Sequence, residues 1–215
     1  MNFYYWLGYN LSRLLAQLFF GFRIINRERV IQTGPVILAV NHQSFFDPPL
    51  AGNACDRPIF FLAKKSLMSM PVLGWLLPKL NVIPVNLEGG DRSALKALIR
   101  ILSAGECALV FPEGSRTPDG TLQPAAAGVG LLIAKTRAPV VPMRIFGAFD
   151  AWPIHGKIRL WRRITIVVGE PIYFSDAELG TGGKDLYARL SQRVMDAIAA
   201  LQLPEEDLHR QDRHR

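Results

Sequence analysis

The chain has 215 residues, of which 49% are hydrophobic and 20% are charged. This length is enough for one domain with a substantial core, and the composition excludes disordered and low-complexity proteins. Lysine and arginine outnumber aspartate and glutamate by 25 to 18, so the net charge is +7. This balance favours partners that carry negative charge, namely nucleic acid, anionic lipid or phosphorylated substrates.

The cysteines and the start of the chain indicate the compartment. The two cysteines, Cys55 and Cys107, belong to no Cys-x-x-Cys pair. They form neither a disulfide framework nor a four-ligand metal site, so we expect an intracellular protein with both thiols buried. The beginning of the sequence shows no positively charged leader and no small-residue cleavage site, so we expect no cleaved signal peptide.

The first segment, residues 3–25, predicts an amphipathic helix. Polar residues interrupt it at Asn10, Arg13, Gln17 and Arg23, which makes a membrane span unfavourable. We expect a helix that lies in the membrane interface, with an ordinary helix packed on the domain as the alternative. Its apolar side chains recur at the helical period and share one face: Phe3, Leu7, Leu11, Leu14, Leu15, Leu18, Phe22 and Ile25.

Short apolar runs between turn signals predict a domain of alternating strands and helices. We expect a single α/β domain over residues 31–203, with a central mostly parallel or mixed sheet flanked by helices. Residues 1–30 then form an N-terminal membrane-interface helix, and residues 204–215 a flexible polar tail. Strands are expected at 36–40, 59–63, 82–85, 108–111, 140–145 and 164–168, and helices at 91–103, 126–136 and 185–201.

The first candidate site is the segment 41–48, which reads NHQSFFDP and directly follows an expected strand. Strand ends in α/β sheets are where ligand crevices form. Across a turn, Asp47 can reach back to one ring nitrogen of His42 and leave the other nitrogen free as a general base. The alternative is a turn in which Asn41 and Asp47 bond to the backbone and His42 has no catalytic role.

The second candidate site is the segment 111–120, FPEGSRTPDG, which also follows a buried strand. Its glycines, hydroxyl groups and Arg116 are suited to holding an anion, because backbone N–H groups and a guanidinium match phosphate oxygens. A solvated loop is the alternative. A Walker loop is excluded, because the GK[ST] ending is missing.

Two further segments have structural explanations as well as functional ones. Pro139 and Pro142 in one expected strand predict that this strand borders an opening, since proline is tolerated at edges and bulges. The apolar, methionine-rich segment 60–77 is too short to span a membrane. Buried core, the wall of an acyl-chain groove and a membrane contact all remain open for it.

The order of these segments closely resembles that of the glycerolipid acyltransferases, whose type member acylates 1-acyl-glycerol-3-phosphate to phosphatidate. The His-x4-Asp block, the KKSL…PVLGW segment, the Phe-Pro-Glu-Gly-Ser-Arg block and the Val-Val-Pro run occur in one chain. The resemblance covers residues 35–172. It implies an intracellular enzyme on the cytoplasmic face of the cell membrane, either peripheral or monotopic.

The resemblance also implies roles for individual residues. His42 would take the proton from the acceptor hydroxyl as that oxygen attacks an acyl thioester, and Asp47 would orient His42. Asn41 would support the turn before them, within the substrate-binding region. Two further blocks of the family bind substrate. The Glu-Gly-x-Arg block maps onto Glu113, Gly114 and Arg116, with Ser115 between them, and would bind the glycerol phosphate. The Val-Pro block places Pro142 at the acyl pocket.

Two positions depart from the family's pattern. Leu87 stands where an arginine is usual, and Ala126 where a lysine is common. The nearest substitute for the arginine is Arg92, provided that the Gly89-Gly90 turn brings it inward. Each charge-assisted contact contributes about 1.5–3 kcal/mol, so these losses leave a different acceptor open, such as another lysolipid or an amine- or hydroxyl-bearing lipid.

The resemblance implies an acyl donor, either acyl-CoA or acyl carrier protein, and no metal or redox cofactor. Basic residues would attract this polyanionic donor or anionic lipid: Lys64, Lys65, Arg159, Arg162 and Arg163. No nucleic-acid motif is present, so no nucleic-acid partner is expected. Competing interpretations are a serine hydrolase using Ser44 or Ser115, a non-catalytic basic membrane-binding module, and an acyltransferase that has lost its chemistry.

Overall fold

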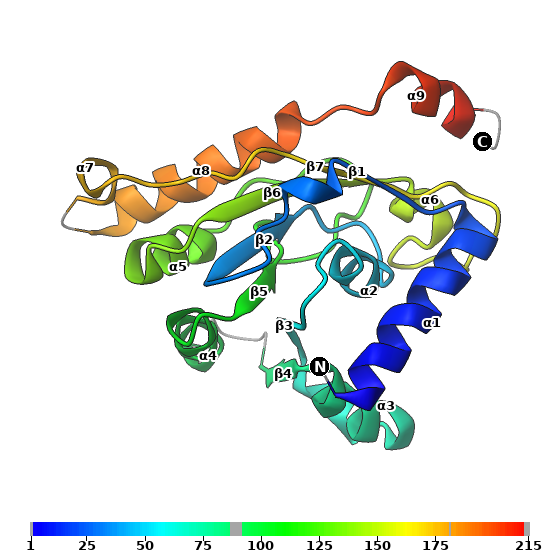
Figure 1. The fold of residues 1–215 in the computed structure, drawn as a ribbon, viewed down its shortest axis with the longest axis horizontal. Coiled ribbons are helices and arrows are strands. Elements are labelled where there is room, and N and C mark those ends of the chain that lie inside the picture. Colours follow the sequence, from blue (N-terminus) through cyan, green and yellow to red (C-terminus); the bar gives the residue numbers. More distant parts are fainter. Residues whose placement is uncertain (1, 87–91, 181, 213–215) are drawn as a thin grey trace.

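A mixed β-sheet forms the centre of the molecule (Figure 1). The computed structural model describes residues 2–86, 92–180 and 182–212, and within them the sheet has seven strands in the order β1-β7-β6-β2-β5-β3-β4. Neighbouring strands are parallel except for β6 and β7, which are antiparallel. The strands are β1 (Arg23–Ile25), β2 (Val36–Val40), β3 (Ile59–Lys64), β4 (Val82–Val85), β5 (Cys107–Val110), β6 (Val140–Phe146) and β7 (Thr165–Val168).

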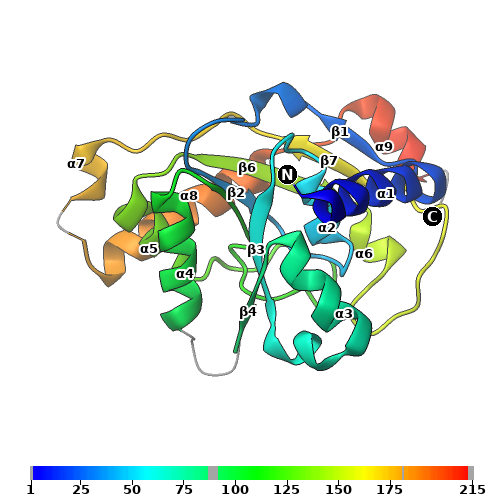
Figure 2. The same cartoon turned by 60° about the horizontal axis from the view of Figure 1, so that its bottom comes forward.

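Helices cover both faces of this sheet, which confirms the predicted α/β class (Figures 1 and 2). Helices α4, α5 and α8 lie on one face, and α1, α2 and α6 on the other. The α-helices are α1 (Phe3–Phe20), α2 (Asp47–Gly52), α3 (Pro71–Leu76), α4 (Arg92–Ser103), α5 (Gly128–Thr136), α6 (Ala148–Ala151), α7 (Asp176–Leu179), α8 (Lys184–Ala200) and α9 (Glu205–Asp212). Short 3-10 helices are η1 (Arg27–Arg29), η2 (Lys65–Ser69) and η3 (Leu77–Leu80).

The central strand β2 shows how the sequence builds two cores. All five of its residues are buried. Since successive side chains of a strand point to opposite faces, Leu38 joins the cluster beneath α1 and α2, whereas Ile37 joins the cluster beneath α4, α5 and α8. A continuous apolar run, rather than an alternating one, is therefore what a strand with helices on both faces requires.

Helix α1 is shorter than predicted, and its apolar face points outward. The side chain of Asn2 caps its start, and Gly21, with φ of 49°, caps its end. The helix therefore stops at Phe20, five residues before the predicted end at Ile25. The chain then turns into β1, so Phe22 is buried in the core rather than on the helix face. Large apolar side chains of α1 are exposed: Phe3, Tyr4, Trp6, Leu7, Leu11, Leu14, Leu15 and Leu18. Among the described residues, no helix combines the length and the hydrophobicity that crossing a membrane requires.

The segment containing α3 is not part of the core. Met70, Val72 and Trp75 are exposed, and the Trp75 ring lies 5.3 Å from that of Tyr4 on α1. The ammonium of Lys79 lies over both rings, 3.3 Å from the centroid of Trp75 and 4.2 Å from that of Tyr4. These contacts attach α3 to the beginning of α1, and they exclude buried core as the explanation of the exposed residues.

The strand containing Pro142 lies inside the sheet, so the prediction that it borders an opening was wrong. Strand β6 lies between β2 and β7, and Pro142 is buried opposite Ala39. Its carbonyl accepts the N–H of Gly169, just beyond the last β6–β7 residue pair, Met143 with Val168. The N and the carbonyl of a strand residue face the same side, so the missing N–H of Pro142 falls where the pairing with β7 stops.

The last part of the chain also differs from the expected flexible tail. Residues Glu205–Asp212 form α9, and the buried carboxylate of Asp207 pairs with Arg23 on β1 at 2.7 Å. This ion pair joins the two ends of the sequence. Residues 23–30 likewise belong with the sheet rather than with the N-terminal helix, because β1 pairs with β7.

Candidate active site

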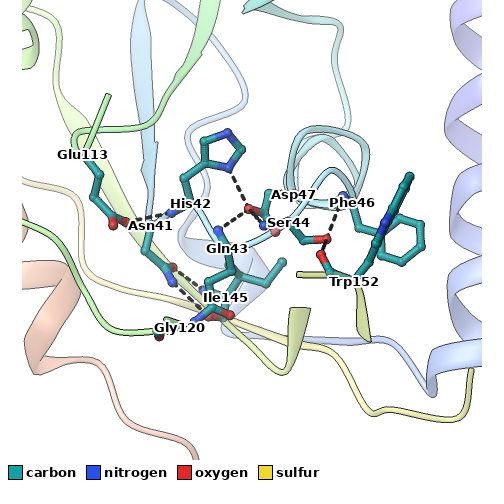
Figure 3. A network of polar contacts seen from close by, with 10 residues as sticks. All are labelled: Asn41, His42, Gln43, Ser44, Phe46, Asp47, Glu113, Gly120, Ile145 and Trp152. Atoms are coloured by element: carbon teal, nitrogen blue, oxygen red, sulfur yellow. Dashed lines mark hydrogen bonds and ion pairs between the residues drawn. The ribbon is translucent and has the colours of Figure 1, made fainter. Parts of the chain in front are cut away.

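Two loops meet at one edge of the sheet and carry most of the predicted site residues (Figure 3). One loop follows β2, and the other follows β5, its parallel neighbour. The carboxyl ends of parallel strands lie at the same edge, which is why the loops approach each other. The N–H of Thr117 donates to the carbonyl of His42 at 2.8 Å, and the N–H of His42 donates to Oε1 of Glu113 at 2.7 Å.

The side chains of His42 and Asp47 form a pair. Nδ1 of His42 lies 2.8 Å from Oδ2 of Asp47, and the imidazole stacks on the ring of Phe111 with centroids 3.8 Å apart. A carboxylate is only an acceptor, so Nδ1 carries the proton and Nε2 keeps its lone pair. Within the described residues Nε2 has no hydrogen-bond partner, so it is available to accept a proton.

Asp47 is buried and begins helix α2. Its Oδ2 also accepts the N–H groups of Gln43 at 2.6 Å and Ser44 at 2.7 Å, so a tight turn surrounds the carboxylate. Burial raises the pKa of Asp47, and the hydrogen bonds from His42 and the two backbone N–H groups oppose that rise. The turn therefore fixes the carboxylate in one position relative to the imidazole.

Glu113 links the two loops. Besides accepting the N–H of His42, it accepts the N–H of Gln123 through Oε2 at 3.0 Å. Burial raises the pKa of Glu113, and these two hydrogen bonds oppose the rise. Both carboxylate oxygens are thus bonded to backbone, and the side chain holds the second loop against the histidine.

Asn41 joins the start of the first loop to strand β6. Its side chain is buried, donates from Nδ2 to the carbonyl of Ile145 at 3.1 Å and accepts the N–H of Ile145 through Oδ1 at 2.7 Å. The amide thus pairs with the backbone of β6 as another strand residue would. These bonds give Asn41 the supporting position expected for it before His42, and its part in substrate binding stays a prediction.

Gly114, Ser115 and Arg116 form the outer part of the second loop. Gly114 has φ of 75° and closes a turn by donating its N–H to the carbonyl of Phe111 at 3.0 Å, while Ser115 is exposed. Beyond this turn the guanidinium of Arg116 lies over the ring of Phe45, with Cζ 3.5 Å from the centroid. The loop thus places a cation beside the His42–Asp47 segment.

The guanidinium of Arg116 is partly buried. Its Nη1 makes no hydrogen bond within the part of the chain that the structure describes. Burial lowers the pKa of Arg116, and the negative charge of Asp47 opposes this shift. A buried N–H donor without a partner is unfavourable, so an anion bound here would be stabilised.

An apolar cavity of about 260 Å³ opens beside His42. It runs between β5, α4 and α5, and its walls include Leu95, Leu98, Val129 and Leu132. His42, Gly114 and Ala126 also line the cavity. Pro142 does not contribute to this wall and lies in the sheet instead, so its predicted position at an acyl pocket stays a prediction.

The remaining candidate residues are those near position 87 and the possible nucleophile Ser44. Leu87, Gly89 and Gly90 lie outside the described residues, as does the side chain of Arg92 at the start of α4. Ser44 is buried, and its hydroxyl donates to the carbonyl of Trp152 at 2.8 Å, so it is not placed as a nucleophile.

Three aromatic residues of the site had no assigned role in the sequence. Phe111 stacks on His42, Phe45 carries Arg116, and the ring of Phe46 lies 5.0 Å from that of Phe20 on α1. The signal that indicates them is their position in the sequence, next to the polar residues of the two motifs.

Known proteins are similar to this chain in sequence and in fold. The family model described as Acyltransferase matches residues 21–146. The 1-acyl-sn-glycerol-3-phosphate acyltransferase BAT2, chloroplastic, of Brassica napus is 31% identical over 155 residues, which are 67% of this chain and 43% of that protein. The chain therefore spans less than half the length of this plant relative.

Two bacterial proteins are similar over more of their length. The 1-acyl-sn-glycerol-3-phosphate acyltransferase of Bacillus subtilis is 27% identical over 170 residues, covering 78% of this chain and 81% of that protein. The crystal structure of the 1-acyl-sn-glycerophosphate acyltransferase PlsC from Thermotoga maritima superposes with a TM-score of 0.71 at 22% identity. This superposition covers 94% of this chain and 79% of that chain, and it shows that the fold is shared.

The fold and the site together define an α/β protein with a His–Asp pair in the loop after β2, next to the loop after the parallel strand β5 and beside an apolar cavity. Because the family model matches more than half of the sequence, the chain belongs to the Acyltransferase family.

Proposed function

We propose that this protein transfers a fatty acyl group from an acyl thioester to the free hydroxyl of a lysophospholipid, with 1-acyl-glycerol-3-phosphate as the acceptor and phosphatidate as the product. The observation that supports this most is the oriented His42–Asp47 pair beside the apolar cavity. The pair supplies a proton acceptor, and the cavity supplies room for a hydrocarbon chain. The names of the relatives support the choice of acceptor.

In the proposed reaction, Nε2 of His42 takes the proton of the acceptor hydroxyl while that oxygen attacks the carbonyl carbon of the thioester. A tetrahedral intermediate forms and collapses, the carbon–sulfur bond breaks, and the departing thiolate takes the proton from the imidazolium. Asp47 stabilises the imidazolium between these steps, because its carboxylate faces Nδ1 at 2.8 Å. The transfer uses no metal or redox group and no covalent enzyme intermediate.

Arg116 would bind the phosphate of the acceptor. Its guanidinium offers two parallel N–H donors, which match phosphate oxygens, and its Nη1 is buried without a partner among the described residues. Phe45 limits the orientations of the guanidinium by stacking on it. Glu113 and Asn41 would act as positioning residues, since their side-chain atoms bond to the backbone of the two loops and of β6.

The acyl chain would lie in the cavity between α4 and α5. The walls consist of leucine and valine side chains, and His42 lies at the cavity's edge. A thioester carbonyl held at this edge places its carbon next to Nε2, where both substrates can meet. Holding two reactants in this way lowers the barrier of a bimolecular reaction by up to about 7–11 kcal/mol.

The protein would work at a membrane, on the cytoplasmic face of the cell membrane, as a peripheral or monotopic enzyme. Support comes from α1, whose exposed apolar face includes Leu7, Leu11, Leu14 and Leu18. Such a face suits the boundary between headgroups and acyl chains. The donor would be acyl-CoA or acyl carrier protein, which are both polyanionic and complement the net charge of +7.

The decisive experiment combines purified protein, a radiolabelled acyl thioester and a panel of lysolipid acceptors in mixed micelles. The panel contains 1-acyl-glycerol-3-phosphate, other lysophospholipids and an amine-bearing lysolipid, because the residues at positions 87 and 126 leave the acceptor open. We expect labelled phosphatidate. A different labelled lipid would overturn the acceptor but keep the reaction class.

The matched control is His42→Ala. A positioned proton acceptor contributes about 10²–10⁴-fold to a rate, so the variant should lose at least about a hundredfold in turnover. A second variant, His155→Ala, removes an exposed histidine from the α6–β7 connection and should keep full activity. A loss of less than threefold in His42→Ala would overturn the proposed base.

A further inference from the structure

The connection between α6 and β7 carries a basic and apolar segment, residues 157–163, that reads KIRLWRR. Its first five residues, from Lys157 to Trp161, are all exposed, and the segment contains no acidic side chain. Within the described part of the chain, Lys157, Arg159 and Arg162 form no ion pair. The segment is thus a concentration of positive charge with apolar side chains between the charges.

The backbone of this segment is held in place. Arg159 donates its N–H to the carbonyl of Ala151, and Trp161 donates its N–H to the carbonyl of Phe19 on α1, both at 2.8 Å. The segment therefore passes beside the C-terminal end of α1, as both views of the fold show (Figures 1 and 2). It is held against the protein although its residues from Lys157 to Trp161 are exposed.

Trp161 has an unfavourable backbone conformation. Its φ is 69°, in the left-handed region that bulky residues rarely adopt. The conformation leaves 62% of the residue exposed, with the indole ring 5.9 Å from that of Phe19. Strained residues persist where the surrounding structure or a function requires them, and no core packing requires an indole at this position.

The segment and α1, which meet at Trp161 and Phe19, both expose apolar side chains. Ile158 and Leu160 are about half exposed, and Leu14 and Leu18 of α1 are 60% and 59% exposed. Tryptophan, leucine and interspersed arginine are the residues that bind the interface of an anionic bilayer. A protein partner would be expected to cover the leucines, but it would leave four neighbouring cations without a defined counter-charge.

We propose that residues 157–163 form a second membrane contact, which binds the anionic headgroups of a lipid bilayer through Lys157 and Arg159 and inserts Trp161 beside α1. This inference goes beyond acyl transfer itself, since transfer in micelles does not depend on it. It implies that α1 and the segment lie on the bilayer together, so the protein has one orientation on the membrane.

The test measures binding of the full-length protein to vesicles by flotation. Two compositions are compared: pure phosphatidylcholine, and phosphatidylcholine with phosphatidylglycerol. The double variant Lys157→Gln/Arg159→Gln removes two exposed charges. Each basic residue near an anionic surface contributes about fivefold in partitioning, so the pair should weaken binding to the anionic vesicles by about 25-fold. Binding to the neutral vesicles should change by less than twofold.

A charge-matched control is Lys184→Gln/Arg189→Gln on α8. Both of its residues are exposed, and they lie at the end of the molecule away from α1 (Figure 1). This control should bind anionic vesicles as the wild type does. Equal losses in the two double variants would overturn the proposal, because net charge alone would then explain binding.

The variant Trp161→Gly tests insertion without a risk to folding. Glycine adopts a positive φ readily, so the thermal midpoint should not fall. Partitioning into both kinds of vesicle should fall by about fivefold or more, because an interfacial aromatic group is lost. Unchanged partitioning would overturn the insertion of Trp161.

Two further results would overturn the lipid assignment. One is a 157/159 double variant that binds anionic vesicles as the wild type does. The other is a variant that loses affinity for acyl carrier protein and keeps its affinity for vesicles, since the segment would then recognise the donor. Transfer to micellar acceptors should be unchanged in all three variants, which separates this proposal from the role of His42.

Discussion

Oδ2 of Asp47 lies 2.8 Å from Nδ1 of His42, and the same oxygen accepts the N–H groups of Gln43 and Ser44. The other oxygen, Oδ1, is buried and has no hydrogen-bond partner within the described residues. One carboxylate oxygen therefore organises the turn and orients the base at the same time. The contribution of the negative charge of Asp47 can be separated from that of its position by a substitution that keeps the shape of the side chain.

We expect Asp47→Asn to fold and to lose turnover by about a hundredfold or more. The amide oxygen can accept the same three hydrogen bonds, but the amide carries no negative charge to stabilise the imidazolium. Circular dichroism and a thermal melt check the fold, and the transfer assay gives turnover. A variant with more than a third of the wild-type turnover would contradict the role of the carboxylate.

Glu113→Gln should destabilise the protein by about 1–3 kcal/mol, because a glutamine cannot accept from both His42 and Gln123 with one oxygen. The loss of stability should also depend on pH. Since burial raises the pKa of Glu113 above its usual 4.5, the folded wild type binds a proton at higher pH than the unfolded chain does. The resulting stability is present below the usual pKa and is lost as the pH rises through the folded-state pKa.

The difference in free energy of unfolding between wild type and Glu113→Gln should therefore be greater at about pH 4.5 than at about pH 8. Urea unfolding at both pH values measures it. Glu206→Gln, at an exposed position of α9, is the control and should shift the stability by less than about 0.5 kcal/mol at either pH. A difference in free energy of unfolding that increases with rising pH would contradict a raised pKa of Glu113.

Arg116→Gln should raise the KM of the phosphate-bearing acceptor by about tenfold or more, because a charge-assisted contact contributes about 1.5–3 kcal/mol. The KM of the acyl thioester should stay within twofold. Arg116→Lys keeps the charge but loses the planar fork that stacks on Phe45, so it should give an intermediate value. Steady-state kinetics with each substrate varied in turn separates these effects, and equal rises in both KM values would point to a misfolded loop instead.

Leu132→Phe should shift the preference for acyl chain length toward shorter chains. Leu132 is buried and lines the cavity beside His42, so a larger side chain shortens the space for the chain. The ratio of kcat/KM for hexadecanoyl to decanoyl donors should fall by about tenfold. Leu98→Met, which keeps the volume of another wall residue, should leave this ratio within twofold. An unchanged ratio in Leu132→Phe would exclude the cavity as the acyl site.

Local patterns predicted most of the sheet and the position of the central pair. Strands β2 and β4 have the predicted boundaries, because each is a branched apolar run between turn residues. The meeting of the His42 and Glu113 loops follows from parallel strands, whose carboxyl ends share one edge. These features depend on short stretches of sequence and on the general rules of sheet geometry.

Features that depend on distant contacts could not be predicted in this way. The pairing of Asn41 with Ile145 joins residues 104 positions apart, and no local signal marks it. Strand β6 lies inside the sheet because β7 pairs with its outer side. Strand β1 is only three residues long, and the helix predicted over residues 3–25 covered it. Helix α9 was missed because its buried Asp207 is stabilised by Arg23, at the other end of the sequence.

The contact between Phe20 and Phe46 couples the outer helix to the chemistry. The two rings lie 5.0 Å apart, and Phe46 immediately precedes Asp47 in the chain. The face of α1 turned toward the protein thus supports the turn that holds the carboxylate. Deleting the first twenty residues to obtain a more tractable enzyme would remove this support, and the shortened protein should turn over slowly even on substrates dispersed in detergent.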